Sequence, residues 1–491
     1  MESKAASTLL IVSISILLYM ILLVHGQPPT IPKQALPTKS GYLPVTSPST
    51  TSSSAMYYAF YEAQNPISSL PDTPILIWLQ GGPGSSSMIG NFFELGPWRL
   101  NPHNIKNKSL ELEKNPGSWN RIFGLLFLDN PIGTGFSIAA TNDSIPTDQQ
   151  TIAEQLYVAI TNFINLDPLL FRSRPIYITG ESYAGKYIPS IGSYILKKNS
   201  LKSSDRLIIN LAGVAIGNGM TDPVTQVATH ALNAYFSGFI NERQKTQLER
   251  AQLEAVNLIK QQNWSAATRA RGKVLNMLTN MTGFATLFDF ARQTEYEIDL
   301  VTKFLKSKEI KQQLNASASI EFEARSDLVQ KKLRADVMKS VKDKVEYLLV
   351  SKTRVLLYQG QRDLRSGVVS VEAWVKTMNW EQIENYLAAE RHVWKVDGKL
   401  AGYVQKWDKL SQVVILAAGH FAPADQNINS QVMIEDWVLQ KGLFSNPTAT
   451  NLQNKSFSSS VYPEVEFDTQ QSHLSDSARL AHLQSTGIIC V

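Results

Sequence analysis

Three residues of types that catalyse acyl transfer each follow a buried, strand-like segment. They are Ser182, Asp363 and His420, and the segments are residues 176–179, 353–360 and 412–419. A serine nucleophile needs a general base, and that base needs a carboxylate to orient it. In α/β sheets that support this chemistry, the residues occur along the chain in the order Ser, Asp or Glu, then His, as they do here. The sequence therefore predicts a nucleophile at Ser182, with His420 as its base and Asp363 as the orienting acid.

Ser182 lies among small residues that predict a tight turn between a strand and a helix. Gly180 precedes it by two positions, and Ala184 and Gly185 follow it. A nucleophile in such a strained turn needs small neighbours, and the positive end of the following helix favours a developing oxyanion. The usual pattern has a second glycine where this chain has Ala184. Taken alone, the segment is therefore also compatible with a plain turn.

Four other histidines follow Ser182 but are less well placed to act as its base. His230 lies in a helical stretch, His392 begins a hairpin strand, and His473 and His482 lie in a polar C-terminal tail. A lone histidine is more often structural, and a loop aspartate is more often a turn former. It is the occurrence of all three residue types at strand ends, in this order, that favours catalysis.

Apolar, strand-like runs alternate with helical patterns in the first half of the chain and return near its end. Glycine-rich turns follow several strands, as residues 81–84 follow the run at 74–80. This order predicts an α/β protein with a mostly parallel sheet, flanking helices and a site at the carboxyl edge. Hairpins are predicted over residues 41–62 and 391–407. The predicted parts are a first core part at 27–240, a helical insertion or cap at 241–350, a second core part at 351–445 and a disordered tail at 446–491.

Charge and composition argue against several classes of function. The net charge is +5 over 491 residues, and no basic run alternates with aromatics, so nucleic-acid binding is not expected. The charges of the predicted insertion are interpreted as solvated helical faces. The seven histidines are scattered without ligand spacing, so we expect no metal and no cofactor.

The N-terminal residues 1–26 predict a secretory signal peptide cleaved near Gly26. Lys4 precedes an apolar run over residues 9–24, which is short for an uncleaved membrane anchor. The chain contains no second long apolar run, so we expect no membrane association after cleavage. Six glycosylation sequons favour a lumenal destination, either extracellular or vacuolar and lysosomal. These are Asn107, Asn142, Asn263, Asn280, Asn315 and Asn454.

The chain has one cysteine, Cys490, next to its C-terminus. No intrachain disulfide can form, so stability must come from the packed core. A free thiol in a loose tail is the interpretation we favour, and pairing with another molecule is the alternative.

Seven motifs occur in one order along the sequence. They are WLQGGPGSSS at 78–87, FELGP at 93–97, LDNPIGTGFS at 128–137, GESYAGKY at 180–187, IGNGMTDP at 216–223, YQGQRD at 358–363 and AAGHFAPADQ at 417–426. Together they make the chain resemble serine carboxypeptidases of the α/β-hydrolase fold over about residues 30–444. With Gln80 and so few cysteines, it is most similar to the vitellogenic-like members and their plant relatives.

The resemblance implies hydrolysis of the C-terminal peptide bond of peptides or proteins through an acyl-enzyme. Ser182, His420 and Asp363 match the catalytic triad, and the N–H groups of Gly82 and Tyr183 match the oxyanion hole. The residues that match the grip on the substrate's terminal carboxylate are Gln80, Glu94 and Glu181.

Two close carboxyls cannot both ionise readily, so one keeps a proton and can donate it to a bound carboxylate. An acidic pH optimum is therefore expected. The sequence departs from the family at Gln80, where Asn is usual, and at Ser85, where a cysteine is usual. The longer amide at Gln80 is expected to shift the bound carboxylate and to alter turnover or preference.

Three alternative functions stay open at this point. Plant members of the family include acyltransferases, but these tend to carry Asp before the nucleophile, so Glu181 and Glu94 favour a peptidase. A binding protein without activity would usually have lost a member of the triad. A generic esterase would use the same three residues. The sequence predicts no oligomeric state.

Overall fold

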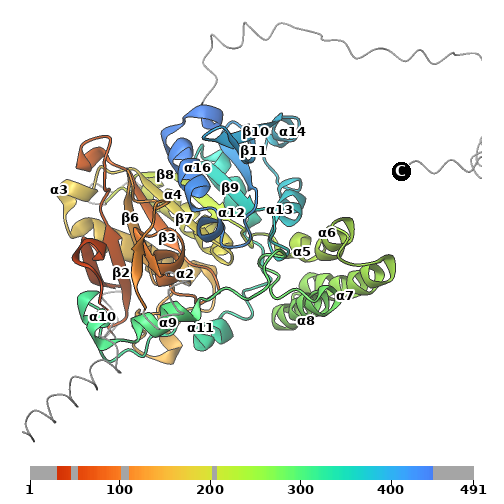
Figure 1. The fold of residues 1–491 in the computed structure, drawn as a ribbon, viewed down its shortest axis with the longest axis horizontal. Coiled ribbons are helices and arrows are strands. Elements are labelled where there is room, and N and C mark those ends of the chain that lie inside the picture. Colours follow the sequence, from red (N-terminus) through yellow and green to blue (C-terminus); the bar gives the residue numbers. More distant parts are fainter. Residues whose placement is uncertain (1–29, 46–52, 101–109, 202–206, 446–491) are drawn as a thin grey trace, which may run out of the picture. The chain divides into compact units, whose positions relative to one another are not determined.

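A ten-stranded mixed sheet runs through the residues that the computed structural model describes, which are 30–45, 53–100, 110–201 and 207–445 (Figure 1). Its order is β1-β2-β6-β3-β7-β8-β9-β12-β11-β10. The run from β6 to β12 is parallel, and the strands outside it pair antiparallel. The predicted mostly parallel sheet is confirmed. The predictions for the signal peptide, Asn107, Asn454, Cys490 and the tail at 446–491 lie outside the described residues.

The strands of this sheet are β1 (Lys39–Pro44), β2 (Ala55–Tyr61), β3 (Ile75–Leu79), β6 (Gly124–Leu128), β7 (Ile176–Glu181), β8 (Leu211–Gly217), β9 (Arg354–Gly360), β10 (Arg391–Val396), β11 (Lys399–Trp407) and β12 (Leu410–Ile415). Both predicted hairpins are present as the antiparallel pairs β1–β2 and β10–β11. The last parallel strand is shorter than predicted, because Ala417 adopts a left-handed conformation with φ of 58° and ends the extended backbone. A separate pair, β4 (Trp98–Leu100) and β5 (Leu112–Lys114), was not predicted.

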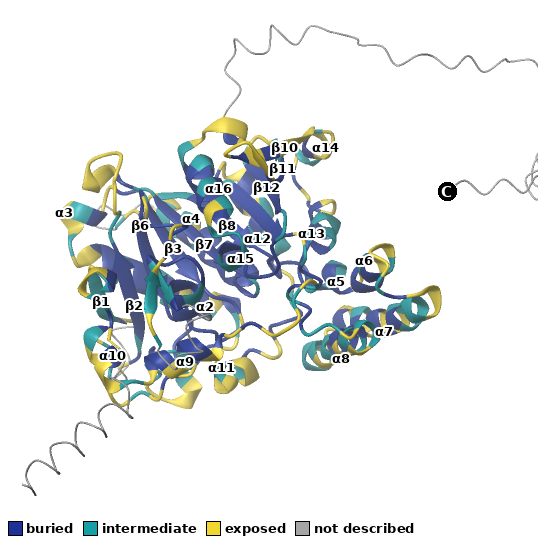
Figure 2. Ribbon diagram, viewed as in Figure 1, coloured by how far each residue is buried: buried dark blue, intermediate teal, exposed yellow. Residues whose placement is uncertain are grey.

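The central strands are apolar on both faces because helices cover both faces of the sheet. In β3, Ile77 and Leu79 join a first apolar cluster with α2 (Gln149–Asn165) and α4 (Ala184–Ser200). Trp78, on the opposite face of the strand, joins a second apolar cluster with α16 (Asn427–Leu439). Figure 2 shows these strands buried between the two layers of helices. This double burial holds the carboxyl edge of the sheet in place.

The segment predicted as a helical insertion contains α7 (Glu242–Lys260), α8 (Trp264–Thr282), α9 (Asp299–Leu305), α10 (Lys308–Gln313), α11 (Asp327–Lys332) and α12 (Lys342–Val350). The Asn241 and Gln244 side chains cap α7, which packs against α8 around Leu248, Val274 and Leu278. In contrast, α12 packs on α4 and β9 and is one of the helices that cover the sheet. The role of this insertion as a cap over the site stays a prediction.

The remaining helices are short: α3 (Pro168–Phe171), α5 (Pro223–Val227), α6 (His230–Phe236), α13 (Val368–Val375), α14 (Ile383–Leu387) and α15 (Ala422–Asp425). Among the described helices, none combines the length and the apolar character that a membrane crossing requires. The sequon asparagines that the structure describes, Asn142, Asn263, Asn280 and Asn315, are all exposed. Their glycosylation stays a prediction.

Candidate active site

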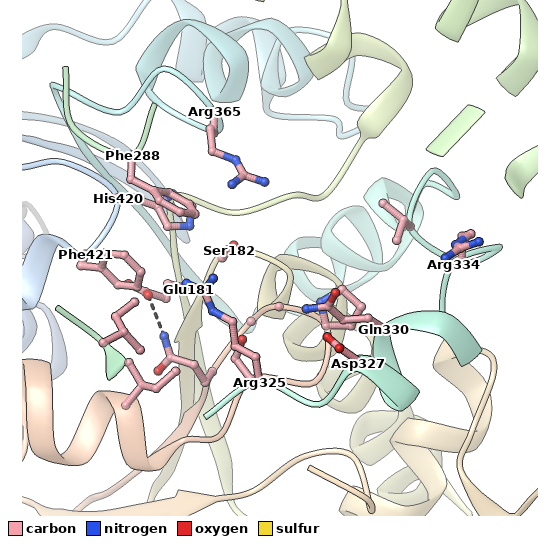
Figure 3. A pocket seen from close by; sticks show the side chains of 18 of the residues that line it. Glu181, Ser182, Phe288, Arg325, Asp327, Gln330, Arg334, Arg365, His420 and Phe421 are labelled. Atoms are coloured by element: carbon pink, nitrogen blue, oxygen red, sulfur yellow. Dashed lines mark hydrogen bonds between the residues drawn. The ribbon is translucent and has the colours of Figure 1, made fainter. Parts of the chain in front are cut away.

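The carboxyl ends of three parallel strands bring Ser182, Asp363 and His420 to one edge of the sheet. Ser182 directly follows β7, Asp363 follows β9, and His420 follows β12. Nδ1 of His420 and Oδ2 of Asp363 are 2.7 Å apart, and both side chains are buried. Ser182 and His420 line the same cavity, whose volume is about 600 Å³ (Figure 3). The structure thus brings together the three residues that the sequence singled out.

Ser182 occupies a strained turn between β7 and α4. Its φ of 62° lies in the left-handed region, which is unfavourable for a serine. Three backbone hydrogen bonds hold the turn: the Ser182 N–H donates to Gly217, and its carbonyl accepts from Gly185 and Met220, each at 2.9 Å. The geometry matches the predicted elbow, which exposes the hydroxyl at the cavity.

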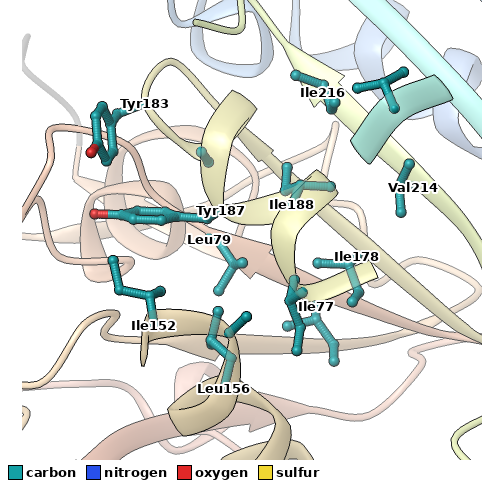
Figure 4. Packing of buried hydrophobic residues seen from close by; sticks show 14 of the residues in the cluster. Ile77, Leu79, Ile152, Leu156, Ile178, Tyr183, Tyr187, Ile188, Val214 and Ile216 are labelled. Atoms are coloured by element: carbon teal, nitrogen blue, oxygen red, sulfur yellow. The ribbon is translucent and has the colours of Figure 1, made fainter. Parts of the chain in front are cut away.

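The helix that follows the serine is anchored from below. Tyr187 and Ile188 of α4 belong to the first apolar cluster, together with Leu79 of β3 and Ile152 of α2 (Figure 4). Because these side chains are buried on every side, α4 cannot shift without opening the core. The N-terminus of α4 therefore stays directed at the serine.

The predicted oxyanion donors lie on two segments that approach each other closely. A Cβ at Gly81 would lie 2.6 Å from the Tyr183 nitrogen, so only glycine fits here. Gly82, the next residue, has a φ of 111°. Within the described ranges, neither the Gly82 N–H nor the Tyr183 N–H donates a hydrogen bond to a protein group. Both are thus available to an oxygen of a ligand.

Asp363 is held by four hydrogen-bond donors. Its Oδ2 accepts from His420 and from Nδ2 of Asn218 at 2.8 Å, and its Oδ1 accepts from the N–H groups of Arg365 at 2.7 Å and Ser366 at 3.3 Å. These donors stabilise a carboxylate and fix its orientation. On the far side of the imidazole, Nε2 of His420 is buried and has no partner among the described residues. That nitrogen is free to accept a proton.

Aromatic rings surround the imidazole. The ring centroids of Phe288 and Phe421 lie 4.5 and 5.5 Å from that of His420. The backbone N–H of His420 donates to the backbone carbonyl of Phe288 at 2.7 Å. Tyr296 packs against Phe421 at 4.8 Å. This wall restricts the rotation of the histidine and its contact with water.

A second polar cluster adjoins the nucleophile and contains Gln80, Glu94 and Glu181, all buried. Nε2 of Gln80 donates to Oε1 of Glu181 at 2.8 Å and to Oε1 of Glu94 at 3.1 Å. Its oxygen accepts from the indole of Trp78 at 2.8 Å, which fixes the direction of the amide. The three residues follow or end β3, the short π-helix η3 (Gly90–Glu94) and β7.

Both glutamates of this cluster keep their protons at pH values well above the range in which a glutamate usually ionises. Burial raises the pKa of Glu94 to about 8, and it raises the pKa of Glu181 well above its ordinary value, with the charge of Glu94 as the next cause. Oε2 of each glutamate is buried and has no partner in the described part of the chain. The pair can therefore present protonated carboxyls to an anionic group in the cavity, which Gln80 and Glu181 line.

Sequence reasoning missed two supporting interactions. Asn218 directly follows β8 and supports Asp363, so the strand-end rule that selected the triad would also have found it. Lys186 and Asp336 form a buried ion pair at 2.8 Å, and Asp336 also accepts from the hydroxyl of Tyr183. This pair ties the turn at Ser182 to the segment between α11 and α12. Its partners are far apart in the sequence, and no local pattern links them.

Comparison with known proteins identifies the family. Residues 29–440 match the family described as serine carboxypeptidase. The chain belongs to the serine carboxypeptidase family. It is 53% identical over 460 residues to Serine carboxypeptidase-like 50 of Arabidopsis thaliana, covering 94% of this chain and 99% of that one. It is 32% identical over 416 residues to Probable serine carboxypeptidase CPVL of Homo sapiens, covering 82% and 83% of the two chains.

A solved structure of a serine carboxypeptidase has the same fold. The prohormone-processing carboxypeptidase Kex1 of Saccharomyces cerevisiae superposes with a TM-score of 0.74 at 25% identity, covering 84% of this chain and 93% of that one. The predicted α/β-hydrolase fold and serine carboxypeptidase class are thereby confirmed. The predicted similarity to vitellogenic-like members and plant relatives is also confirmed.

Proposed function

We propose that this serine carboxypeptidase removes C-terminal residues from peptides through an acyl-enzyme formed on Ser182. One observation carries the proposal: the cavity that holds Ser182 and His420 is also lined by Gln80 and Glu181. A nucleophile and a carboxylate-binding cluster in one cavity limit cleavage to the last peptide bond of a chain.

In the acylation step, Nε2 of His420 accepts the proton of the Ser182 hydroxyl as the oxygen attacks the scissile carbonyl. Asp363 holds the imidazole through Nδ1 and stabilises the imidazolium that forms. The N–H groups of Gly82 and Tyr183 bind the oxyanion. Such a donor contributes on the order of 10²–10³ in rate. The imidazolium then protonates the leaving amine, which departs as a free amino acid.

In the deacylation step, a water molecule enters from the site that the amino acid has left. His420 accepts a proton from this water as it attacks the ester carbonyl, and the same N–H groups stabilise the second oxyanion. Ser182 regains its proton and the shortened peptide leaves. A hydroxyl compound in place of water would give acyl transfer, which is the second outcome open to this acyl-enzyme.

The carboxylate cluster selects the free acid. When Glu94 and Glu181 hold their protons, they can donate hydrogen bonds to the terminal carboxylate, and Gln80 positions them through its two amide hydrogens. When the pair ionises, it repels that carboxylate. Because burial raises the pKa of Glu94 to about 8, binding is favoured throughout the acidic range.

We also propose export through the secretory pathway to an extracellular or vacuolar compartment. The exposure of Asn142, Asn263, Asn280 and Asn315 supports this, because oligosaccharyltransferase needs accessible sequons. A shift in electrophoretic mobility after treatment of the native protein with an endoglycosidase would test it. An unchanged mobility would contradict glycosylation.

The decisive experiment compares N-blocked dipeptides with their C-terminal amides between pH 4 and 8, for the wild type and Ser182→Ala. We expect serine-dependent release of the C-terminal residue from the free acids, strongest at acidic pH. Release in equal measure from acids and amides would overturn the role of the carboxylate cluster. Labelling of Ser182 by a fluorophosphonate without peptide release would favour acyl transfer. The absence of labelling would favour the alternative of a binding protein without activity.

A further inference from the structure

One wall of the active-site cavity is basic. We call its cationic side chains the basic wall, and they are Arg325, Lys331, Arg334 and Arg365. Beyond the proton-holding Glu181, the acidic residue that lines the cavity is Asp327. In the part of the chain that the structure describes, no ion pair within 4.0 Å involves any of the four cations. The wall therefore presents positive charge to whatever fills the cavity.

Arg365 is fixed next to the catalytic base. Its backbone N–H donates to Oδ1 of Asp363, and its guanidinium lies over the ring of Phe288, 4.4 Å from the centroid. Phe288 in turn packs against the His420 ring, 4.5 Å away. In Figure 3 the Arg365 side chain points into the space above Ser182. Its charge thus faces the space next to the nucleophile.

Two further guanidiniums act on Arg365. Burial is the main cause that lowers the pKa of Arg365; the charge of Asp363 opposes this, and the positive charge of Arg325 lowers the pKa further. On α8, burial and then the charge of Arg365 lower the pKa of Arg271. The charge of Glu295 also raises the pKa of Arg365, but within the described residues neither carboxylate forms an ion pair with it, and like charges gathered around a cavity are stabilised when an anion binds between them.

The two ends of the cavity differ in character. Gln80 and Glu181 mark the end that takes the terminal carboxylate, and the apolar side chains of Ile89, Ile298 and Phe421 line the same cavity. Figure 3 places Phe421 on one side of Ser182, and Arg334, Asp327 and Gln330 on the other. With the leaving residue at the apolar end beside Gln80 and Glu181, Arg365 above Ser182 and Arg334 on the far side face the part of the peptide that stays on the serine.

We propose that the basic wall selects peptides with an acidic side chain on the residue that donates the scissile carbonyl, with Arg365 and Arg325 binding that carboxylate. The inference rests on the proposed carboxypeptidase function. It adds the class of substrate, which the triad and the carboxylate cluster do not determine.

The test compares two substrates that differ in one charge, N-blocked Glu-Phe and N-blocked Gln-Phe, at pH 6. A charge-assisted hydrogen bond discriminates by about tenfold, so kcat/KM for Glu-Phe is expected to exceed that for Gln-Phe by about that factor. Arg365→Gln should abolish the preference, and the ratio of the two rates within this variant corrects for any general change in activity, because both substrates meet the same enzyme. Arg250→Gln, an exposed arginine of α7, is the matched control and should keep the preference.

A pH series gives a second readout that a purely structural role of Arg365 would not move. A glutamate side chain of the substrate titrates at about 4.3, so the preference should fall between pH 6 and pH 4 in the wild type. The charged groups around the substrate side chain are the basic wall, Asp327, His420 and, when ionised, Glu181, and those that act on Arg365 from behind are Asp363, Glu295 and Arg271. Arg325→Gln, at an exposed position, replaces Arg365→Gln if that variant does not fold, and it should also reduce the preference.

The outcomes separate the two proposals. Cleavage of both peptides at equal rates by the wild type would overturn the basic-wall inference and keep the carboxypeptidase proposal. A preference that survives in Arg365→Gln and in Arg325→Gln would overturn the assignment to these residues. Failure to cleave either peptide, with a Lys-Phe substrate also intact, would overturn the carboxypeptidase proposal on which the inference rests.

Discussion

Two carboxyl sites lie next to each other in this molecule and are built in opposite ways. Asp363 receives four hydrogen bonds, from His420, Asn218 and two backbone N–H groups. Glu94 and Glu181 share the single amide nitrogen of Gln80, and each keeps one buried oxygen without a partner in the described residues. Both sites are equally buried.

The difference lies in the number of hydrogen-bond donors, because both sites are buried and only Asp363 is surrounded by them. A carboxyl with four donors is stabilised as an anion and can support an imidazolium. A pair of carboxyls with few donors is stabilised as neutral acids and can bind an anion. One edge of the sheet thus holds a carboxyl that orients the histidine and, beside it, two acids that keep their protons.

We call Asp363 with its four donors the donor-rich site, and Glu94 with Glu181 the donor-poor site. The largest effect on activity is expected when the donor-rich site is disrupted. Asp363→Asn keeps the shape but removes the charge that holds the histidine in its working tautomer, so kcat should fall by about 10⁴. KM for an N-blocked dipeptide should change little, because Gln80, Glu94 and Glu181 are untouched. Steady-state kinetics measure both constants. A fall of less than tenfold in kcat would show that Asp363 does not orient the base.

The donor-poor site should make the protein less stable as pH rises. The pKa of Glu94 is raised from an ordinary 4.5 to about 8, and that of Glu181 is raised too, so the folded state binds more protons than the unfolded state between these values. The contribution of the pair to the free energy of unfolding is then fully present below about pH 4.5 and is lost as pH rises toward 8. We expect Tm to fall by about 5 °C between pH 5 and 8.

Thermal melts followed by circular dichroism measure this fall in Tm. The control is the double variant Glu94→Gln and Glu181→Gln, which cannot ionise and should lose much of the dependence. Asp129 and Asp425, whose pKa values burial raises to about 6, account for a residual dependence at lower pH. An equal fall in the double variant would assign the whole effect to other groups.

Binding of the substrate should follow the same ionisation. KM for a free-acid dipeptide is expected to rise by about tenfold between pH 8 and 9, because the ionised Glu94 repels the terminal carboxylate. In the double glutamine variant KM should stay flat over this range. A C-terminal amide serves as the uncharged control. A rise in KM of the double variant that equals the wild-type rise would contradict the role of the pair.

The smallest change is expected from shortening the amide that joins the pair. Gln80→Asn cannot keep both hydrogen bonds to the glutamates together with that from Trp78, and one lost hydrogen bond corresponds to about fivefold in KM. The amide substrate should be unaffected. A KM for the free acid that is equal in both enzymes would show that the longer side chain makes no difference to binding.

The sequence predicted the donor-rich site better than the donor-poor one. Ser182, Asp363 and His420 are residues of known chemistry at the ends of recognisable strands, and parallel pairing brings such ends together. Glu94 and Gln80 followed only from the resemblance, because buried acids carry no local pattern. The mostly parallel character of the sheet and both hairpins were likewise accessible from apolar runs and turn residues, but the order of the strands was not.

Other features were beyond a single sequence because they depend on side chains that meet across the fold. The stacking of Arg365 on Phe288 and the pairing of Lys186 with Asp336 join distant segments. The early end of β12 depends on the left-handed backbone at Ala417, a residue that rarely adopts it. The unbroken apolar run alone favours continuing the strand there.

The burial of the sheet between two apolar clusters also has a practical consequence. With a single cysteine in the chain, the packed core does without the cross-links on which many exported enzymes rely. Folding should therefore be indifferent to the redox potential of the compartment. We expect the enzyme to stay active in millimolar dithiothreitol, a condition that would inactivate a disulfide-dependent hydrolase.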